Sequence, residues 1–144
     1  SRGEVVDDAS LLAKRGELAA LILDVWNGEP DAISQELIAA ADIATPHIAG
    51  YSFEGKINGT AMSVQAFARH FGIEPLMDFV PEHTPIPQIE LRGADGGYLA
   101  TEEVAGRLLE HFPIYDLDNE LRSDPSAFEK IRGEYKYRRE FVWR

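Results

Sequence analysis

The sequence contains no cysteine among its 144 residues, so disulfide bonds, thiolate zinc sites and cysteine nucleophiles are excluded. Long hydrophobic runs are also missing. The longest run, Leu18 to Leu23, is far shorter than the ~20 apolar residues that a membrane-spanning helix requires. No apolar stretch of the kind found in a signal peptide follows the first residues, Ser1 to Glu4. We therefore expect a globular, cytoplasmic protein, and the absence of cysteine is compatible with a reducing compartment.

Basic residues are scarce in this chain. There are 14 Lys and Arg residues against 25 Asp and Glu residues, which gives a net charge of −11. Such a balance argues against non-specific binding to nucleic acid or to an anionic membrane, and we expect neither partner. Six basic residues gather between Lys130 and Arg144, where they alternate with aromatic side chains. A solvated helix followed by a strand is the favoured interpretation of this segment, and contact with RNA is the alternative.

The first third of the chain alternates between helical and strand-like patterns. These patterns predict a short helix from Asp7 to Gly16, a strand over Leu18–Val25, a helix over Ile33–Ala41 and a strand over Asp42–Thr45. The run over 18–25 is almost entirely apolar and is bounded by turn residues, as in a strand buried on both faces of a parallel sheet. The order helix, strand, helix, strand predicts the end of an open α/β sheet.

A long helix and a second region follow. The spacing of apolar residues predicts one helix over Ser52–Phe71 that ends at Gly72, and the proline-rich connector after it indicates a domain boundary. The elements predicted beyond the connector are a strand over Ile86–Arg92, a turn over Gly93–Gly97, a helix over Thr101–Phe112, a strand over Ile114–Leu117, a helix from its N-cap Asp124 to about Arg138, and a strand over Phe141–Trp143. We therefore expect a small α+β domain over 73–144.

Three residues with chemical potential lie in three successive loops: Arg2, Glu29 and His47. The loops at the carboxyl ends of parallel strands meet at one edge of a sheet, so these side chains are expected to converge. An Arg can hold both oxygens of a carboxylate, and a His oriented by a Glu is a general acid–base pair that works near neutral pH. Each residue alone is compatible with a structural role. Their combination in this order favours an active site.

The remaining histidines, His70, His83 and His111, lie far apart in the sequence. No pair of histidines has the spacing of metal ligands on one helical face. We therefore predict no metal site.

Three segments of the sequence resemble the Arg, Glu and His signatures of the D-2-hydroxyacid dehydrogenase family. They are Ser1-Arg2-Gly3-Glu4-Val5-Val6-Asp7, Leu23-Asp24-Val25-Trp26-Asn27-Gly28-Glu29-Pro30 and Thr45-Pro46-His47-Ile48-Ala49-Gly50. Their order and approximate spacing match as well. The continuation from His47 to Lys56, and the stretch from Phe128 to Glu140, resemble the branch of the family that carries an extra C-terminal dimerisation domain and acts in pyridoxal phosphate synthesis.

The resemblance implies a fold, a cofactor and a set of residue roles. Residues 1–50 would be the C-terminal part of a Rossmann-type NAD-binding domain, 51–72 a long helix that returns toward the substrate domain, and 73–144 the domain that forms a homodimer. The substrate would be a small phosphorylated 2-hydroxy acid. His47 would take the proton of its C2 hydroxyl, Glu29 would support His47, and Arg2 would bind its carboxylate. Asp24 and Gly50 would contact NAD, and Tyr51 would contact the substrate.

The sequence departs from the family in several respects, because the acidic residue that would bind the adenosine ribose of NAD and the N-terminal part of the substrate domain are missing. It contains no Gly-x-Gly-x-x-Gly turn of the kind that binds the pyrophosphate of NAD, and Gly93-Ala94-Asp95-Gly96-Gly97 lies in a predicted hairpin-like turn instead. We therefore expect this chain to be the C-terminal portion of a dehydrogenase and to be inactive by itself. Two alternatives stay open: a family member that acts on phosphoglycerate or glyoxylate, and a dimerisation fragment without catalysis.

Overall fold

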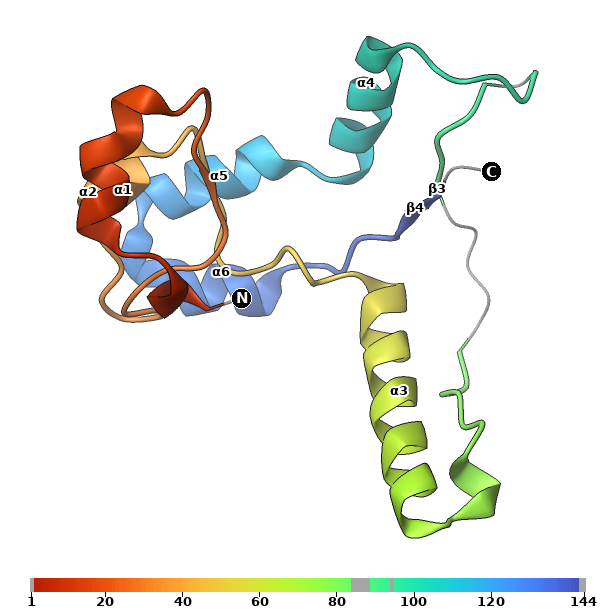
Figure 1. Cartoon of the computed structure of the whole chain (residues 1–144). Helices are drawn as coiled ribbons and strands as arrows, with labels where there is room; N and C mark the ends of the chain where they lie inside the picture. Colours follow the sequence, from red (N-terminus) through yellow and green to blue (C-terminus); the bar gives the residue numbers. More distant parts are fainter. Residues whose placement is uncertain (1, 84–88, 94, 143–144) are drawn as a thin grey trace. The chain divides into compact units, whose positions relative to one another are not determined.

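The computed structural model describes residues 2–83, 89–93 and 95–142 (Figure 1). The chain forms two compact units. The first unit consists of Ser1–Ala49 and Phe112–Lys136, and the second unit consists of Gly50–His111 and Tyr137–Arg144. The structure does not place the two units relative to one another, so each is described by itself.

The first unit combines helices with a small parallel sheet. In the part that the structure describes, its elements are η1 (Gly3–Val5), α1 (Asp8–Lys14), η2 (Arg15–Glu17), β1 (Ile22–Leu23), α2 (Gln35–Ala40), β2 (Ile43–Ala44), α5 (Ile114–Ser123), η4 (Pro125–Ala127) and α6 (Phe128–Glu134). Strands β1 and β2 are parallel, with Ile22 opposite Ile43 and Leu23 opposite Ala44. Polar side chains cap the N-termini of α1 and α2. The carboxylate of Asp7 accepts from Ser10 N at 2.8 Å, and the hydroxyl of Ser34 accepts from Leu37 N at 3.2 Å.

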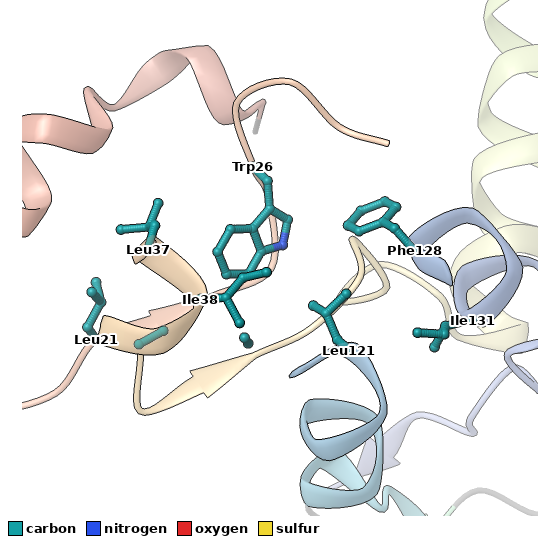
Figure 2. Close-up of a cluster of buried hydrophobic side chains, with 9 residues drawn as sticks. Leu21, Trp26, Leu37, Ile38, Leu121, Phe128 and Ile131 are labelled. Atoms are coloured by element: carbon teal, nitrogen blue, oxygen red, sulfur yellow. The ribbon is translucent and has the colours of Figure 1, made fainter. Parts of the chain in front are cut away.

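A single hydrophobic core joins the two segments of the first unit (Figure 2). Trp26 and Ile38 come from the N-terminal segment, while Leu121 from α5 and Phe128 and Ile131 from α6 meet them from the C-terminal segment. Trp26, Leu121 and Phe128 have almost no exposed surface. Burial of side chains of this size supplies most of the favourable free energy of folding. The two segments therefore fold as one body although 62 residues separate them in the sequence.

An ion pair on α5 completes the edge of β2. Asp118 is buried, and its carboxylate accepts from Ala44 N at 2.6 Å and from Arg122 Nε at 2.8 Å. Arg122 in turn donates to the carbonyls of Ile38 at 2.6 Å and Ala41 at 2.8 Å. Buried backbone groups need hydrogen-bond partners. Asp118 and Arg122 therefore satisfy backbone groups at β2 and at the end of α2 that no further strand binds within the described residues.

The second unit is built around one long helix. Its described elements are α3 (Phe53–Phe71), η3 (Glu74–Leu76), β3 (Ile89–Glu90), α4 (Thr101–His111) and β4 (Phe141–Val142). Ser52 caps the start of α3 by accepting from Gly55 N at 3.0 Å, and Gly72, with a φ of 68°, ends it in the left-handed conformation. Strands β3 and β4 are parallel, with Ile89 opposite Phe141 and Glu90 opposite Val142.

An ion pair ties the start of α3 to the C-terminal segment of the second unit. Glu54 accepts from Arg139 Nε at 2.6 Å and from Glu140 N at 3.0 Å. Burial raises the pKa of Glu54, but the backbone hydrogen bonds and the neighbouring Arg139 outweigh it and hold that pKa below its usual value. The Glu54 carboxylate is therefore favoured in its charged form.

Many predicted elements are present, and several are shorter than predicted. The long helix is confirmed as α3, and Gly93 N donates to Gly97 O at 3.0 Å, between the two ends of the predicted turn. The strand predicted over Leu18–Val25 is reduced to β1, and the last helix ends at Glu134 rather than near Arg138. Residues 84–88, 94 and 143–144 lie outside the described residues, so parts of the strands predicted over 86–92 and 141–143 cannot be compared.

One predicted element is wrong: residues 114–117 form the first turn of α5 and not a strand. A run of four residues is too short to show a period, so only its extension decides the matter. Leu117 and Leu121 are four residues apart and both pack at the core, and Asp118 and Arg122 form an ion pair at the same spacing. These pairs stabilise a helix because residues four apart are neighbours on its surface.

The mixture of helices with small parallel sheets supports the α/β class predicted from the sequence. The division into 1–50, 51–72 and 73–144 does not coincide with the two compact units, because residues 112–136 pack on the first unit. The Rossmann-type and dimerisation domains stay predictions. No helix within the described residues is long and apolar enough to cross a membrane.

Candidate active site

The three residues predicted to be catalytic line one cavity in the first unit. The cavity has a volume of about 480 Å³, and Arg2, Glu29 and His47 all contribute to its wall. Arg2 precedes η1, Glu29 lies in the loop after β1, and His47 lies in the loop after β2. Loops after neighbouring parallel strands meet at one edge of a sheet, and β1 and β2 are such a pair.

Glu29 and His47 form a short, partly buried pair. The distance from His47 Nδ1 to Glu29 Oε1 is 2.5 Å, and the two side chains are 24% and 17% exposed. The second oxygen of Glu29 accepts from Trp26 N at 3.1 Å, which fixes the carboxylate. A carboxylate accepts hydrogen bonds, so Nδ1 carries the proton of the neutral ring and Nε2 is its acceptor. The pair therefore leaves one ring nitrogen able to take up a proton.

Asp24 holds the loop that carries His47. Its Oδ1 accepts from Thr45 Oγ1 at 2.7 Å and from Ile48 N at 2.8 Å, and its Oδ2 accepts from Ala49 N at 2.9 Å. His47 itself has a φ of 56°, in the left-handed region that is uncommon for residues other than glycine. Hydrogen bonds on both sides of His47 stabilise this conformation.

The indole of Trp26 adds a further bond to the same loop, because its Nε1 donates to Thr45 O at 2.8 Å. Trp26 is thus linked to both members of the pair: its backbone holds Glu29, and its side chain holds the loop of His47. Since Trp26 is 2% exposed and belongs to the hydrophobic core, the geometry of the site depends on the packing of that core.

Gly3 brings Arg2 to the cavity. A Cβ atom at Gly3 would overlap the peptide bond between Trp26 and Asn27, so only glycine permits this approach. Asn27 fastens the N-terminal segment from the other side, donating to Val6 O at 3.1 Å and to Asp8 Oδ1 at 2.7 Å. The N-terminal segment is therefore docked on the loop that contains Glu29.

The other predicted site residues lie in different places. Asp24 is in the first unit, next to the loop of His47. Gly50 and Tyr51 belong to the second unit, and the structure does not place them relative to the cavity. The ring of Tyr51 packs edge-on against Tyr137, with centroids 5.6 Å apart, and Lys56 Nζ lies 3.9 Å from the Tyr51 centroid.

Two residues of the cavity wall, Phe128 and Arg132, lie outside the three signature segments and were not predicted as site residues. Phe128 and Arg132 are four residues apart on α6 and therefore share a face of that helix. No local pattern links them to Glu29 or His47, since it is the core that brings α6 to the cavity. Among the residues that the structure describes, no group of three or more His, Asp or Glu side chains is placed to hold a metal ion.

Comparison with known proteins extends the resemblance seen in the sequence. No family model matches the chain. The chain is 43% identical to an erythronate-4-phosphate dehydrogenase of Bacteroides fragilis over 142 residues, which cover 97% of this chain and 38% of that enzyme. It is 39% identical to the enzyme of the same name from Porphyromonas gingivalis, over 96% of this chain and 37% of the relative. A Yersinia pestis enzyme of that name is 38% identical over 97% of this chain and 38% of its own length.

The chain thus spans about 38% of the length of these relatives while nearly all of it is matched. The resemblance stated from the Arg, Glu and His signatures is confirmed, because identity near 40% extends far beyond those short segments. Over nearly its whole length, this chain is similar to part of the erythronate-4-phosphate dehydrogenases.

Proposed function

We propose that this chain supplies the acid–base residues of an erythronate-4-phosphate dehydrogenase. The reaction is the NAD-dependent oxidation of 4-phospho-D-erythronate to 2-oxo-3-hydroxy-4-phosphobutanoate, a step in pyridoxal phosphate synthesis. The observation that carries the proposal is the His47–Glu29 pair, which lies in one cavity with Arg2. The names of the relatives support the substrate.

The residues of the cavity fit the demands of this oxidation. When the C2–H bond breaks, the C2 hydroxyl must lose its proton as the ketone forms. His47 Nε2 takes that proton, and Glu29 stabilises the imidazolium that results. The guanidinium of Arg2 binds the C1 carboxylate with two parallel hydrogen bonds and thereby orients C2. A bound NAD would supply the acceptor for the hydride that leaves C2.

The residues of this chain fit the nicotinamide end of NAD but not its pyrophosphate. Oδ2 of Asp24 accepts a single hydrogen bond within the described residues, whereas a carboxylate oxygen has room for a second. Asp24 can therefore accept from the carboxamide of the nicotinamide, and we assign Gly50 to the same cofactor and Tyr51 to the substrate. The sequence has no Gly-x-Gly-x-x-Gly turn for the pyrophosphate, so that part of NAD must be bound by residues beyond these.

Residues 73–144 are proposed to form a homodimer. Several large apolar side chains in this region are exposed, among them Val80 at 57% and Tyr98 at 84%. Exposed apolar side chains are favoured in interfaces between identical subunits because the partner removes them from water. Analytical ultracentrifugation of the protein tests this assignment, and a monomer at all concentrations would contradict it.

Replacement of His47 tests the proposed chemistry. We expect His47→Asn to lower kcat for 4-phosphoerythronate about 10²–10⁴-fold in the full-length protein, because the general base is lost. Formation of NADH, followed by absorbance, measures the change. His70→Asn is a matched control, since His70 is exposed on α3 and does not line the cavity. Near-normal turnover by His47→Asn would refute the assignment.

A further inference from the structure

The cavity that contains Arg2 holds a second guanidinium, that of Arg132. Arg132 lies on α6, 85 residues along the chain from His47 and farther still from Glu29 and Arg2. The proposed acid–base chemistry needs one cation for one carboxylate, and Arg2 provides it. Arg132 has no part in the proton transfer, so its presence in the same wall requires another explanation.

Helix α6 presents Arg132 from a rigid position. Phe128 is fully buried and Ile131 is 4% exposed, and both belong to the core that contains Trp26. Phe128 also lines the cavity and lies one helical turn before Arg132, so the two side chains share a face of α6. The same core residue, Trp26, holds Glu29 and the loop of His47. Arg132 is thus anchored to the same scaffold as the acid–base pair.

The charges around the cavity leave Arg132 able to bind an anion. The carboxylates in its wall are Glu4 and Glu29, and Glu29 is engaged by His47 and by Trp26 N. Glu4 is exposed to solvent. The ion pair of Arg132 Nη1 with Glu129 spans 3.5 Å, and the Glu129 side chain is 66% exposed. A guanidinium has five N–H donors, so Arg132 can donate to a ligand oxygen in addition to the groups that it already contacts.

The size of the cavity agrees with a ligand that reaches both arginines. Pockets of roughly 300–1,000 Å³ hold whole small-molecule ligands, and this cavity has about 480 Å³. We propose that Arg132 binds a second anionic group at the far end of the substrate, a phosphate ester, while Arg2 binds the carboxylate. This inference rests on the proposed function, and it makes Arg132 a specificity-determining residue for doubly anionic 2-hydroxy acids.

The test compares two substrates in the full-length protein: 4-phosphoerythronate and erythronate, which lacks the phosphate. The measured quantity is the ratio of kcat/KM for the phosphorylated acid to kcat/KM for the unphosphorylated one. We expect Arg132→Gln to lower this ratio about 10–100-fold, mainly through the KM of the phosphorylated acid, because a charge-assisted pair of hydrogen bonds is lost. Arg132→Lys should recover part of the ratio, since it restores the charge without the planar fork.

Lys130→Gln is the matched control for charge. Lys130 lies on the same helix and is exposed, and it does not line the cavity. Its replacement removes one positive charge and should leave the ratio within about twofold of the wild-type value, because an exposed charge away from the site is screened by solvent. A fall of the same size in Lys130→Gln and Arg132→Gln would overturn the proposal, since it would show a general effect of net charge.

Binding of inorganic phosphate, measured by calorimetry, separates this inference from the proposed function. If the wild type oxidises neither acid but binds phosphate in a manner that Arg132→Gln abolishes, the proposed function fails and the anion subsite stands. If the wild type prefers the phosphorylated acid and Arg132→Gln keeps that preference, the subsite fails and the proposed function stands. Thermal unfolding of each variant shows whether a loss of binding reflects a loss of folding instead.

Discussion

The two units of the chain are stabilised in different ways. In the described part of the first unit, the buried apolar residues are Leu21, Trp26, Leu37, Ile38, Ala41, Ala44, Pro46, Ile48, Leu121, Phe128 and Ile131. In the described part of the second unit, the buried apolar residues are Ala61, Ala68 and Leu91. The second unit instead has one long capped helix and the ion pair of Glu54 with Arg139. The second unit thus relies on a capped helix and on polar contacts between its segments, whereas the first unit relies on a hydrophobic core that joins its segments.

The difference in buried core between the two units explains why the candidate site lies in the first unit. A general acid–base pair needs side chains held within a few tenths of an ångström, and tight packing is what provides such rigidity. The His47–Glu29 pair is attached to the buried Trp26 in the first unit. The long helix α3 of the second unit exposes Met62, Phe67 and Phe71 by more than half of their surface. Such a surface suits contact with other protein better than it suits positioning of reactive groups.

The largest expected effect comes from a matched pair of phenylalanines, one in each unit. Phe128→Ala should lower the free energy of unfolding by about 3–5 kcal/mol, because a fully buried ring is lost from the core and a cavity remains. Phe67→Ala should lower it by less than about 1 kcal/mol, since Phe67 is 55% exposed. Denaturant unfolding measures both changes. Similar losses in the two variants would show that the units do not differ in the way described.

A smaller effect is expected when Asp24 is replaced. Asp24→Asn changes an oxygen that accepts from the loop of His47 into a donor, so the bonds to Ile48 N and Ala49 N cannot both persist. We expect the amides of Ile48 and Ala49 to exchange hydrogen about 10–100-fold faster, as the loss of one or two such bonds implies. Asp31→Asn, an exposed position in the same unit, is the control. Unchanged exchange at both amides would show that Asp24 does not hold the loop.

The smallest expected effect is a pH dependence in the second unit. The pKa of Glu54 is lowered in the folded chain, so its ion pair stabilises the fold above the usual Glu pKa, and this contribution is lost as the pH falls through the lowered value. We expect the Glu140 amide, which donates to Glu54, to exchange faster in acid, with a loss of less than about 1 kcal/mol in local stability. Nuclear magnetic resonance of that amide measures the change. In Glu54→Gln this acid-dependent step should vanish, and its persistence would assign it to another group.

Local signals in the sequence predicted the parts of the structure that depend on neighbouring residues. The helix α3 and its end at Gly72 follow from the spacing of apolar residues and from a terminating glycine, which act within a few positions. The same applies to Asp124, whose carboxylate accepts from Ser126 N at 3.1 Å ahead of Pro125. The strand predicted at 114–117 is wrong because a run of four residues is too short to show a period, and packing of Leu117 and Leu121 on the core selected the helix.

The sequence by itself determined the candidate catalytic residues. The order and spacing of Arg2, Glu29 and His47 singled them out, and the resemblance gave each a role. Only the tertiary structure decided that α5 and α6 pack on the first 49 residues, that Asp24 and Trp26 hold the loop of His47, and that Arg132 shares the cavity. The physical reason is range: caps and periodicity act between close neighbours along the chain, whereas burial of Trp26 against Phe128 joins residues about a hundred positions apart, and no local pattern encodes such a contact.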